Sequence, residues 1–435
     1  MRFVATLICA LTGVPPLRAQ QVAAPTRPIS LLDAITLGRQ QGVNAAIARL
    51  NVRAANARTG ERRADLLPNL SGRATFTRQT LNLDEFGIPI ATGITDPFNL
   101  WNFQIRASQT LLDPSAIVRL RAERDTAVAA GLDAQAVGEI AGATAGLAYL
   151  RVLSAEETVR ARQGDSTVAA DLLSQARRLV QAGINPAIDA TRSEVSFAAV
   201  RTQLEIARNA AGQARLDLSR ALDLPSGTRL ELADSLGLAT LDIPRQPDEA
   251  ARFAREHRAE LAAEHARTQA AERNLRSIRF ENLPSLSANG GYIESGRQTG
   301  TLAGTYNVQL LLSIPILDGL RRQYRASEQH ARLEIQRIRE RDMGNQVETE
   351  ARQAILDLSS AEQQVAIAGD RVRLANRELA EADQRFRAGV AGSVETTNAQ
   401  GSVIAANDAL IQARVRYGTA RVSAYRALGV IDQLH

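Results

Sequence analysis

Several residue types are absent or scarce in this chain of 435 residues, and each scarcity narrows its possible functions. There is no lysine, so all 52 basic residues are arginine. A single cysteine, Cys9, allows no disulfide within the chain, and the four histidines lack the ligand spacing of a metal site. No nucleophile–base arrangement or phosphate-binding loop is present, so the sequence does not predict an enzyme.

Aromatic side chains are also scarce, since they make up only 4% of the chain. Alanine dominates the apolar content, which favours close helix–helix contact over a thick globular core. The net charge is +5, and residues of both signs are interspersed along the helices. This pattern predicts a solvated face and no binding of nucleic acid. Beyond the N-terminus no run approaches the ~20 apolar residues of a membrane helix. If the chain crosses a membrane, strands must do so.

The N-terminus has the pattern of a secretory signal. Arg2 precedes the apolar stretch 3–11, and Leu17-Arg18-Ala19 is a mediocre cleavage site, so residues 1–19 are predicted to be a signal peptide. Cleavage after Ala19 would remove Cys9 and leave an exported chain held together by packing alone. Lipidation of Cys9 is not favoured, because the apolar stretch before it is short.

The rest of the chain consists of one structural unit that occurs twice, as an internal duplication. Landmarks recur in the same order in both halves: 67–71 matches 283–287, 111–113 matches 316–318, 182–184 matches 388–390, and 221–224 matches 427–430. The first repeat, 20–225, is predicted to hold a helix at 31–66, strands at 69–80 and 99–112, a long helix at 114–182 and a helix at 186–222. A linker at 226–246, with short strands or turns, precedes the second repeat, 247–435. That repeat is predicted to hold a helix at 248–282, strands at 285–296 and 304–316, a long helix at 318–388 and a helix at 393–430.

The long helices would each measure roughly 100 Å, and each ends at a glycine signal. The strands alternate between apolar and polar residues over the length that a tilted strand needs to span an outer membrane. Four strands cannot close a barrel in lipid, so a barrel must be shared between chains. Two chains would give a filled interior and three a passage, which the polar inward faces favour.

These features resemble the TolC-type outer membrane efflux proteins over essentially the whole mature chain. The resemblance rests on the duplicated unit, the Leu-Pro-x-Leu-Ser strand starts, and the turn motifs Gly183…Asp189-Ala190 and Arg387-Ala388-Gly389…Glu395. It implies a mainly α fold with a membrane β-barrel part. Three chains would form a twelve-stranded barrel in the outer-membrane lipid, continued by a twelve-helix periplasmic tunnel.

The resemblance also implies a function and partners. The homotrimer would be the passive exit duct of a tripartite efflux or type I secretion system, in the cell outer membrane with a long periplasmic extension. Its partners would be a periplasmic adaptor (membrane fusion) protein and an inner-membrane transporter of the RND, ABC or MFS type, with no cofactor. The competing interpretation is a periplasmic adaptor, or a structural coiled coil without channel activity.

The resemblance places the candidate site at the helix tips. Adaptor contacts would be Gly183, Ile184, Phe386, Gly389 and Val390. A periplasmic gate would be formed by Asp189, Glu395 and Asn398. The family often has a carboxylate at the position of Asn398, so one of the two carboxylate rings at its constriction would be a ring of amides here. In the family an arginine forms an ion pair at the gate, and the matching position here is Ala391. The gate ion pair is therefore either absent or supplied by another arginine, such as Arg192 or Arg387. A ring of Glu395 side chains would favour cations, although a glutamate in the first turn of a helix is also favoured by the helix dipole alone.

Overall fold

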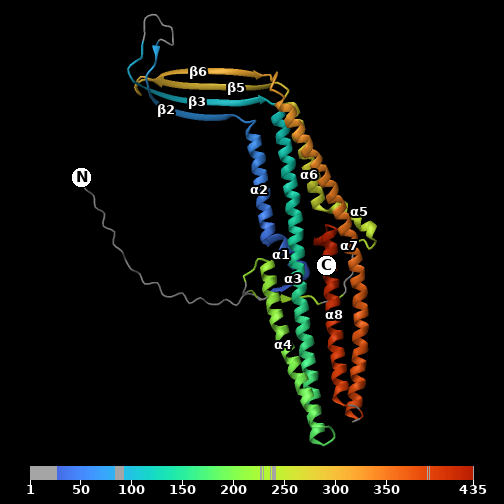
Figure 1. The fold of residues 1–435 in the computed structure, drawn as a ribbon. Coiled ribbons are helices and arrows are strands. Elements are labelled where there is room, and N and C mark those ends of the chain that lie inside the picture. Colours follow the sequence, from blue (N-terminus) through green and yellow to red (C-terminus); the bar gives the residue numbers. More distant parts are fainter. Residues whose placement is uncertain are drawn as a thin grey trace, which may run out of the picture.

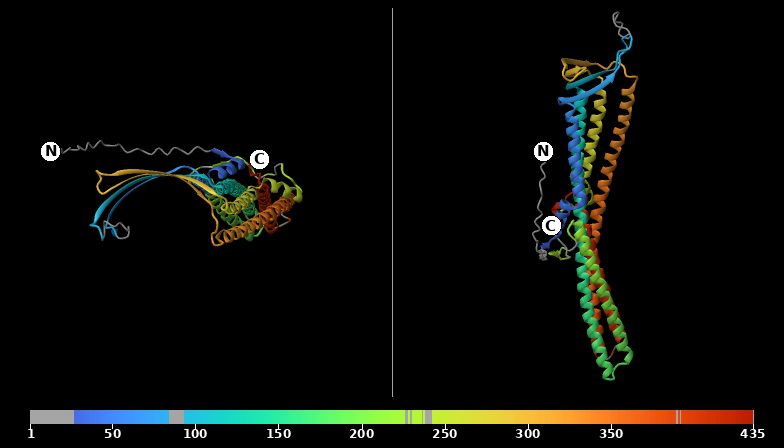
Figure 2. Two further views of the ribbon diagram at one scale, coloured as in Figure 1. Left: turned by 90° about the horizontal axis from the view of Figure 1, so that it is seen from above. Right: turned by 90° about the vertical axis from the view of Figure 1, so that its left-hand side faces the viewer.

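The computed structural model describes residues 27–83, 93–225, 228, 230–235, 237, 242–388, 390 and 392–434. The predicted signal peptide with Cys9, and the tip residues Gly389 and Ala391, lie outside the described residues. The described part is a long bundle of helices with a curved four-stranded sheet across one end (Figures 1 and 2).

The elements follow the predicted duplicated order. The first half contains β1 (Arg27–Ile29), α1 (Leu31–Gln41), α2 (Val43–Ala64), β2 (Asn69–Gln79), β3 (Phe98–Leu112), α3 (Pro114–Gln181) and α4 (Ala187–Ala221). The second half contains β4 (Leu230–Leu232), α5 (Pro247–His257), α6 (Ala259–Phe280), β5 (Ser285–Gly296), β6 (Ala303–Ser313), α7 (Arg321–Arg387), α8 (Ser393–Ala427) and the 3₁₀ helix η2 (Ile431–Gln433). The prediction of a mainly helical fold built from a duplicated unit is confirmed.

Local sequence explains where the longest helix begins and ends. Asp113 caps α3 by accepting a hydrogen bond from the Ala116 N–H at 3.0 Å, and Pro114 occupies the first helical turn. At the other end Gly183 adopts φ +72°, and the Ile184 N–H donates to the Leu179 carbonyl at 3.0 Å. This is the glycine-terminated ending in which a left-handed residue closes the last turn.

Two helix predictions are wrong, because the predicted helices 31–66 and 248–282 are each broken in two. The first break is at Gly42, which has a non-helical backbone (φ −51°, ψ 136°) between α1 and α2. It lets α1 cross α3 closely: a Cβ added to Gly38 would lie 2.5 Å from the Cβ of Ala145. The second break is at Arg258, whose buried guanidinium bonds to Glu260 and Glu350. Tertiary contacts therefore override a continuous helical pattern.

Two helix ends also differ from prediction. The long helix expected from 318 begins at Arg321, because Gly319 and Leu320 both have φ +66°. The helix expected to end at 430 ends at Ala427, before Gly429 with φ +76°. Residues in the left-handed region do not continue a right-handed helix.

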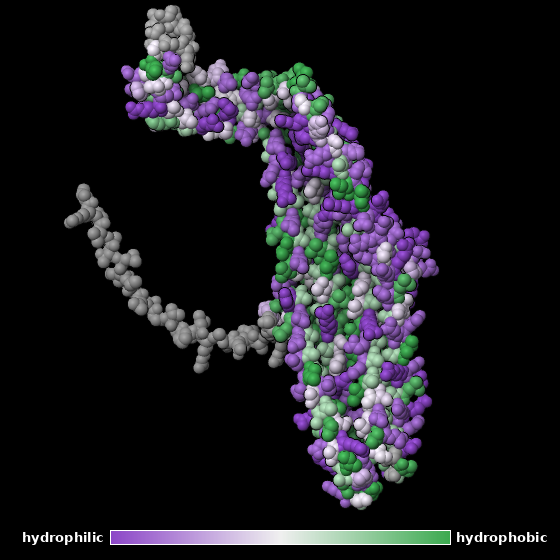
Figure 3. Space-filling view, viewed as in Figure 1, coloured by the Kyte–Doolittle hydropathy of each residue, from purple (hydrophilic) through white to green (hydrophobic). Residues whose placement is uncertain are grey.

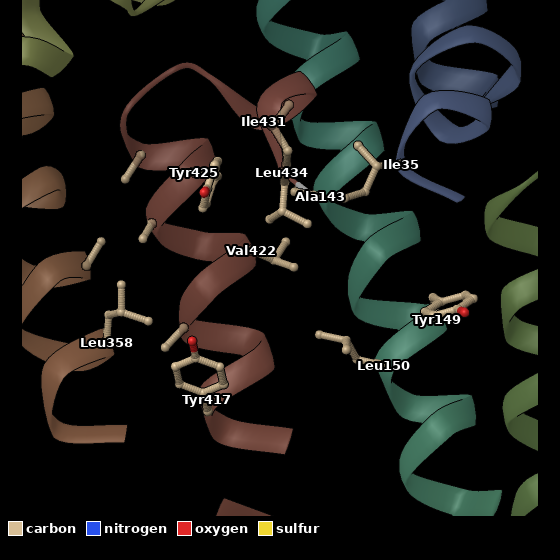
Figure 4. Packing of buried hydrophobic residues seen from close by; sticks show 14 of the residues in the cluster. Ile35, Ala143, Tyr149, Leu150, Leu358, Tyr417, Val422, Tyr425, Ile431 and Leu434 are labelled. Carbon is tan, nitrogen blue, oxygen red and sulfur yellow. The ribbon is translucent and has the colours of Figure 1, made fainter. Parts of the chain in front are cut away.

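The bundle has its main core midway along α3 and α7, at a level that we call the equator (Figure 1). Here β1 pairs in parallel with β4, and the short helices α1, α5 and η2 pack around the long ones. The C-terminal Ile431 and Leu434 insert between α8 and α3, where they join Tyr149, Leu150 and Tyr425 (Figure 4). Many other members of this core are alanines, as the composition predicted.

Among the described helices, only α3 is long and apolar enough to cross a membrane by length and composition. Its most apolar window has a mean hydropathy of 1.2, and 67% of that window is buried inside the protein. Such burial is what a core helix requires.

The sheet has two chemically different faces. Its strands run antiparallel in the order β2-β3-β5-β6, so β2 and β6 are edges that pair with no further strand among the described residues. The strand register places Leu70, Ala107, Gly290 and Val308 side by side on one face, and most other residues of that face are apolar. The opposite face carries hydroxyl, amide and guanidinium groups, including those of Ser71, Arg73, Gln104, Arg106, Asn289, Asn307 and Gln309.

Candidate periplasmic gate and docking tips

The end of the molecule opposite the sheet consists of two helical hairpins. One is α3 with α4, the other is α7 with α8, and their turns lie at the same end (Figure 1). Gly183 forms the first turn. Gly389, predicted for the second, is outside the described residues, but the Val390 N–H donates to the Arg385 carbonyl at 3.0 Å. The two repeats thus close their long helices in the same way.

Apolar side chains are exposed at these tips (Figure 3). Ile184 is 62% exposed and Val390 is 73% exposed, and Ile188 and Val394 extend the apolar surface along α4 and α8. Phe386, predicted as a further adaptor contact, is only 2% exposed in this chain.

Asp189 joins the two hairpins. Its carboxylate lies in the first turn of α4 and is 5% exposed. The Ser393 hydroxyl, at the start of α8, donates to Asp189 Oδ1 at 2.7 Å, and Asn185 Nδ2 donates to Oδ2 at 3.0 Å. Arg192 is more distant, at 3.9 Å from Oδ1. The principal partners of this carboxylate are therefore a hydroxyl and an amide.

The other two predicted gate residues lie elsewhere on α8. Glu395 is 3.2 Å from Arg385 of α7, so it bridges the helices of one hairpin. Asn398 lines a groove of about 460 Å³ between α4 and α8, together with Arg192, Val195, Val394 and others. Arg387 pairs with Asp383 at 2.7 Å and not with Asp189. The structure thus places Asp189 and Asn398 at the α4–α8 contact and Glu395 at the α7–α8 contact.

A second bridge between the hairpins was not predicted. Arg162 of α3 donates to Asp165 at 2.8 Å and to both carboxylate oxygens of Asp408 on α8. Gln400 of α8 also donates to the Asp165 carbonyl at 3.4 Å. Burial raises the pKa of the Asp165 carboxyl, against the lowering effect of Arg162. The one sequence signal was a basic and an acidic residue three apart inside an alanine-rich helix.

The described residues include no group of three or more His, Cys, Asp or Glu side chains that could hold a metal ion. The tips are built from hydrogen-bonded acidic residues, hydroxyls and exposed apolar side chains.

The family model that matches the chain is that of the outer membrane efflux proteins, over residues 38–223 and 251–430. Solved structures agree on the fold. The outer membrane channel CmeC of Campylobacter jejuni is 16% identical, with a TM-score of 0.80 over 92% of this chain and 86% of that one. A membrane protein from Pseudomonas aeruginosa is 19% identical, with a TM-score of 0.79 over 92% of each chain.

The open state of the Neisseria gonorrhoeae MtrE outer membrane channel is 17% identical, with a TM-score of 0.74 over 93% of this chain and 90% of that one. No curated protein sequence matches the chain significantly. The family match covers both repeats and most of the chain. This chain therefore belongs to the outer membrane efflux protein family, whose members are outer-membrane exit ducts with a long periplasmic helical part.

Proposed function

We propose that three copies of this chain form the exit duct of a tripartite efflux or type I secretion system. The observation that carries the proposal is the four-stranded sheet, which has two unpaired edges and two faces of opposite chemistry. In a lipid bilayer every backbone N–H and C=O must be paired, so β2 and β6 need partners. Pairing β2 of one copy with β6 of the next would close a twelve-stranded barrel with a polar interior.

Exposed apolar stripes on the helices support the same ring. On α7, Tyr324, Ile335, Ile338, Leu356, Ile367 and Leu374 all fall on one exposed face. On the other side of the molecule, Ile47 and Leu50 are exposed on α2 beside a hollow of about 1160 Å³ between α2, α3 and α4. A monomer in water would not keep apolar surface of this extent uncovered.

The two stripes lie at matching heights. Ile47 and Ile338 are equally far along the chain from the ends of α2 and α7 that face the sheet, and so are Leu50 and Ile335. Since each helix rises by the same distance per residue, these pairs share a level. We therefore place α7 of one copy against α2 of its neighbour above the equator, and against α4 below it.

We further propose that the tips form the closed end of the duct. The Asp189–Ser393 hydrogen bond and the Arg162–Asp408 ion pair would hold the hairpins together. A periplasmic adaptor would dock on Gly183, Ile184, Gly389 and Val390 and separate the hairpins, while an inner-membrane transporter of the RND, ABC or MFS type drives export. Within the constriction, Glu395 and Asn398 would provide rings of carboxylate and amide groups.

Cysteine cross-linking tests the ring. A chain carrying both Ile47→Cys and Ile338→Cys should form disulfide-linked trimers in outer-membrane fractions, because these residues would meet across the interface. The matched control, Ile47→Cys with Ile367→Cys, places the second cysteine far below the first and should not cross-link. Recovery of both variants as soluble periplasmic monomers would refute the proposed function and support the adaptor or coiled-coil alternative.

A further inference from the structure

The polar face of the sheet carries charge of one sign only. The four strands contain three arginines, Arg73, Arg78 and Arg106, and a single carboxylate, Glu294. Register places Glu294 opposite Phe103 on the mostly apolar face, where it accepts a hydrogen bond from the Tyr292 hydroxyl at 2.9 Å. Arg73 and Arg106 therefore have no acidic residue on their own face of the described strands.

The two arginines of this face are neighbours. Arg73 pairs in register with Gln104, and Arg106 pairs with Ser71, so they occupy diagonal positions on β2 and β3. Diagonal neighbours of this kind have Cα atoms about 7–8 Å apart. Both side chains are exposed, and neither forms an ion pair with any residue that the structure describes. Two adjacent, unpaired guanidinium groups are a concentrated positive charge.

Their position along the strands is also specific. Arg73 and the partner of Arg106, Ser71, lie in the half of β2 that joins the helices, away from the loop between β2 and β3. In the proposed duct, this is where the helical tunnel opens into the barrel. Threefold symmetry would bring six arginines to one level of the interior.

We infer that Arg73 and Arg106 form an anion-selective ring at the junction of tunnel and barrel, so that the duct favours anionic over cationic solutes. This inference rests on the proposed function, because the polar face becomes the interior only when the barrel closes. Rings of arginine select for anions in water-filled pores.

The expected effect is measurable at low ionic strength. In water, a charge within one Debye length of the ion path changes the local anion-to-cation ratio by about twofold. An ion in a wide lumen lies within one Debye length of only about half of the six charges at a time, so about three such doublings, or roughly tenfold, are expected in the permeability ratio, and less at high salt. A ring of Glu395 at the tip would act in the opposite direction, so the two filters must be separated by mutation.

The test is the reversal potential of full-length protein in planar bilayers under a potassium chloride gradient. The double variant Arg73→Gln/Arg106→Gln should lose about tenfold in chloride-over-potassium permeability, whereas Arg73→Lys/Arg106→Lys should retain it. The matched control is Arg78→Gln, which removes the same charge from the opposite face of the same strand and should leave selectivity unchanged.

The outcomes distinguish a failure of the arginine ring from a failure of the duct itself. If the wild-type protein conducts but the glutamine variant keeps its reversal potential, the inference of an anion-selective arginine ring is refuted, while the proposed duct is unaffected. An equal shift in the Arg78→Gln control would also overturn the ring. If the folded wild-type protein forms no conducting pore, the proposed function itself fails.

Discussion

Replacing Glu139 with glutamine should stabilise this protein above neutral pH and have little effect in mild acid. Glu139 lies on α3 at the equator and is 4% exposed. Its side chain accepts one hydrogen bond, from Gln135 at 3.3 Å. Arg39 of α1, Arg258 at the break between α5 and α6, and Glu260 of α6 are the charged groups that act on it.

Burial raises the pKa of the Glu139 carboxyl from its ordinary value of 4.5 to about 7, and the nearby Glu260 adds to the increase. The folded protein therefore keeps this proton in a range where the unfolded chain has lost it. Stability from this group is fully present below the ordinary pKa and is lost as pH rises through the folded pKa. The difference between these two pKa values corresponds to a loss of about 3 kcal/mol in folding stability above pH 7.

The Glu139→Gln variant avoids this cost, because a neutral amide needs no ionisation. We expect it to be more stable than the wild type by up to about 3 kcal/mol near pH 8, and by less than about 1 kcal/mol near pH 5. Thermal unfolding followed by far-ultraviolet circular dichroism in detergent measures this as a melting temperature several degrees higher at the alkaline pH only.

The matched control is Asp171→Asn, since Asp171 is an exposed carboxylate on the same helix. It should show no pH-dependent gain. If Glu139→Gln gave the same change in melting temperature at both pH values, its carboxylate would not be titrating as burial requires, and the reasoning would be refuted.

Three further predictions concern other parts of the molecule. Ser393→Ala removes the hydroxyl that donates to the buried Asp189 and leaves the carboxylate oxygen Oδ1 without this donor, which should destabilise the closed tip by about 1–3 kcal/mol. The open fraction in single-channel records should therefore rise. An unchanged open fraction would exclude Asp189 from the gate. Gly38→Val places a side chain where even a Cβ would lie 2.5 Å from that of Ala145, so thermal unfolding should show a loss of about 1–3 kcal/mol. Glu395→Ala should reduce divalent-cation block from the periplasmic side, whereas an unaltered block would leave Glu395 as a partner of Arg385 only.

Much of the fold could be read from the sequence, because its signals are local or repeated. The cap at Asp113 and the terminating glycine at Gly183 each act within one turn of helix. The alternation in β2 and β3 likewise specifies two faces without reference to any partner. The prediction failed at Gly42 and Arg258, where the helices are interrupted. Near these breaks the chain contacts residues that are distant in sequence, Gly38 with Ala145 and Arg258 with Glu350, and local sequence does not specify such contacts.

The candidate site was predicted only in outline. The repeat located the tips, and Asp189 does lie at the contact between hairpins. The partner of that carboxylate, Ser393, is far along the chain and has no sequence signature that distinguishes it from other serines. Phe386 and Glu395 were assigned to the tip surface and constriction by position alone. Their orientation depends on the rotation of α7 and α8 about their axes, which packing determines.

The sequence by itself determined that the chain is a duplicated unit with two very long helices, two pairs of alternating strands and a glycine turn at Gly183, since periodicity and capping are properties of short segments. Only the tertiary structure decided which charged groups meet. Arg162 with Asp408, and Arg73 beside Arg106, depend on helix rotation and strand register. Both are set when the halves pack together, because burial of apolar faces selects one register among many that local sequence allows.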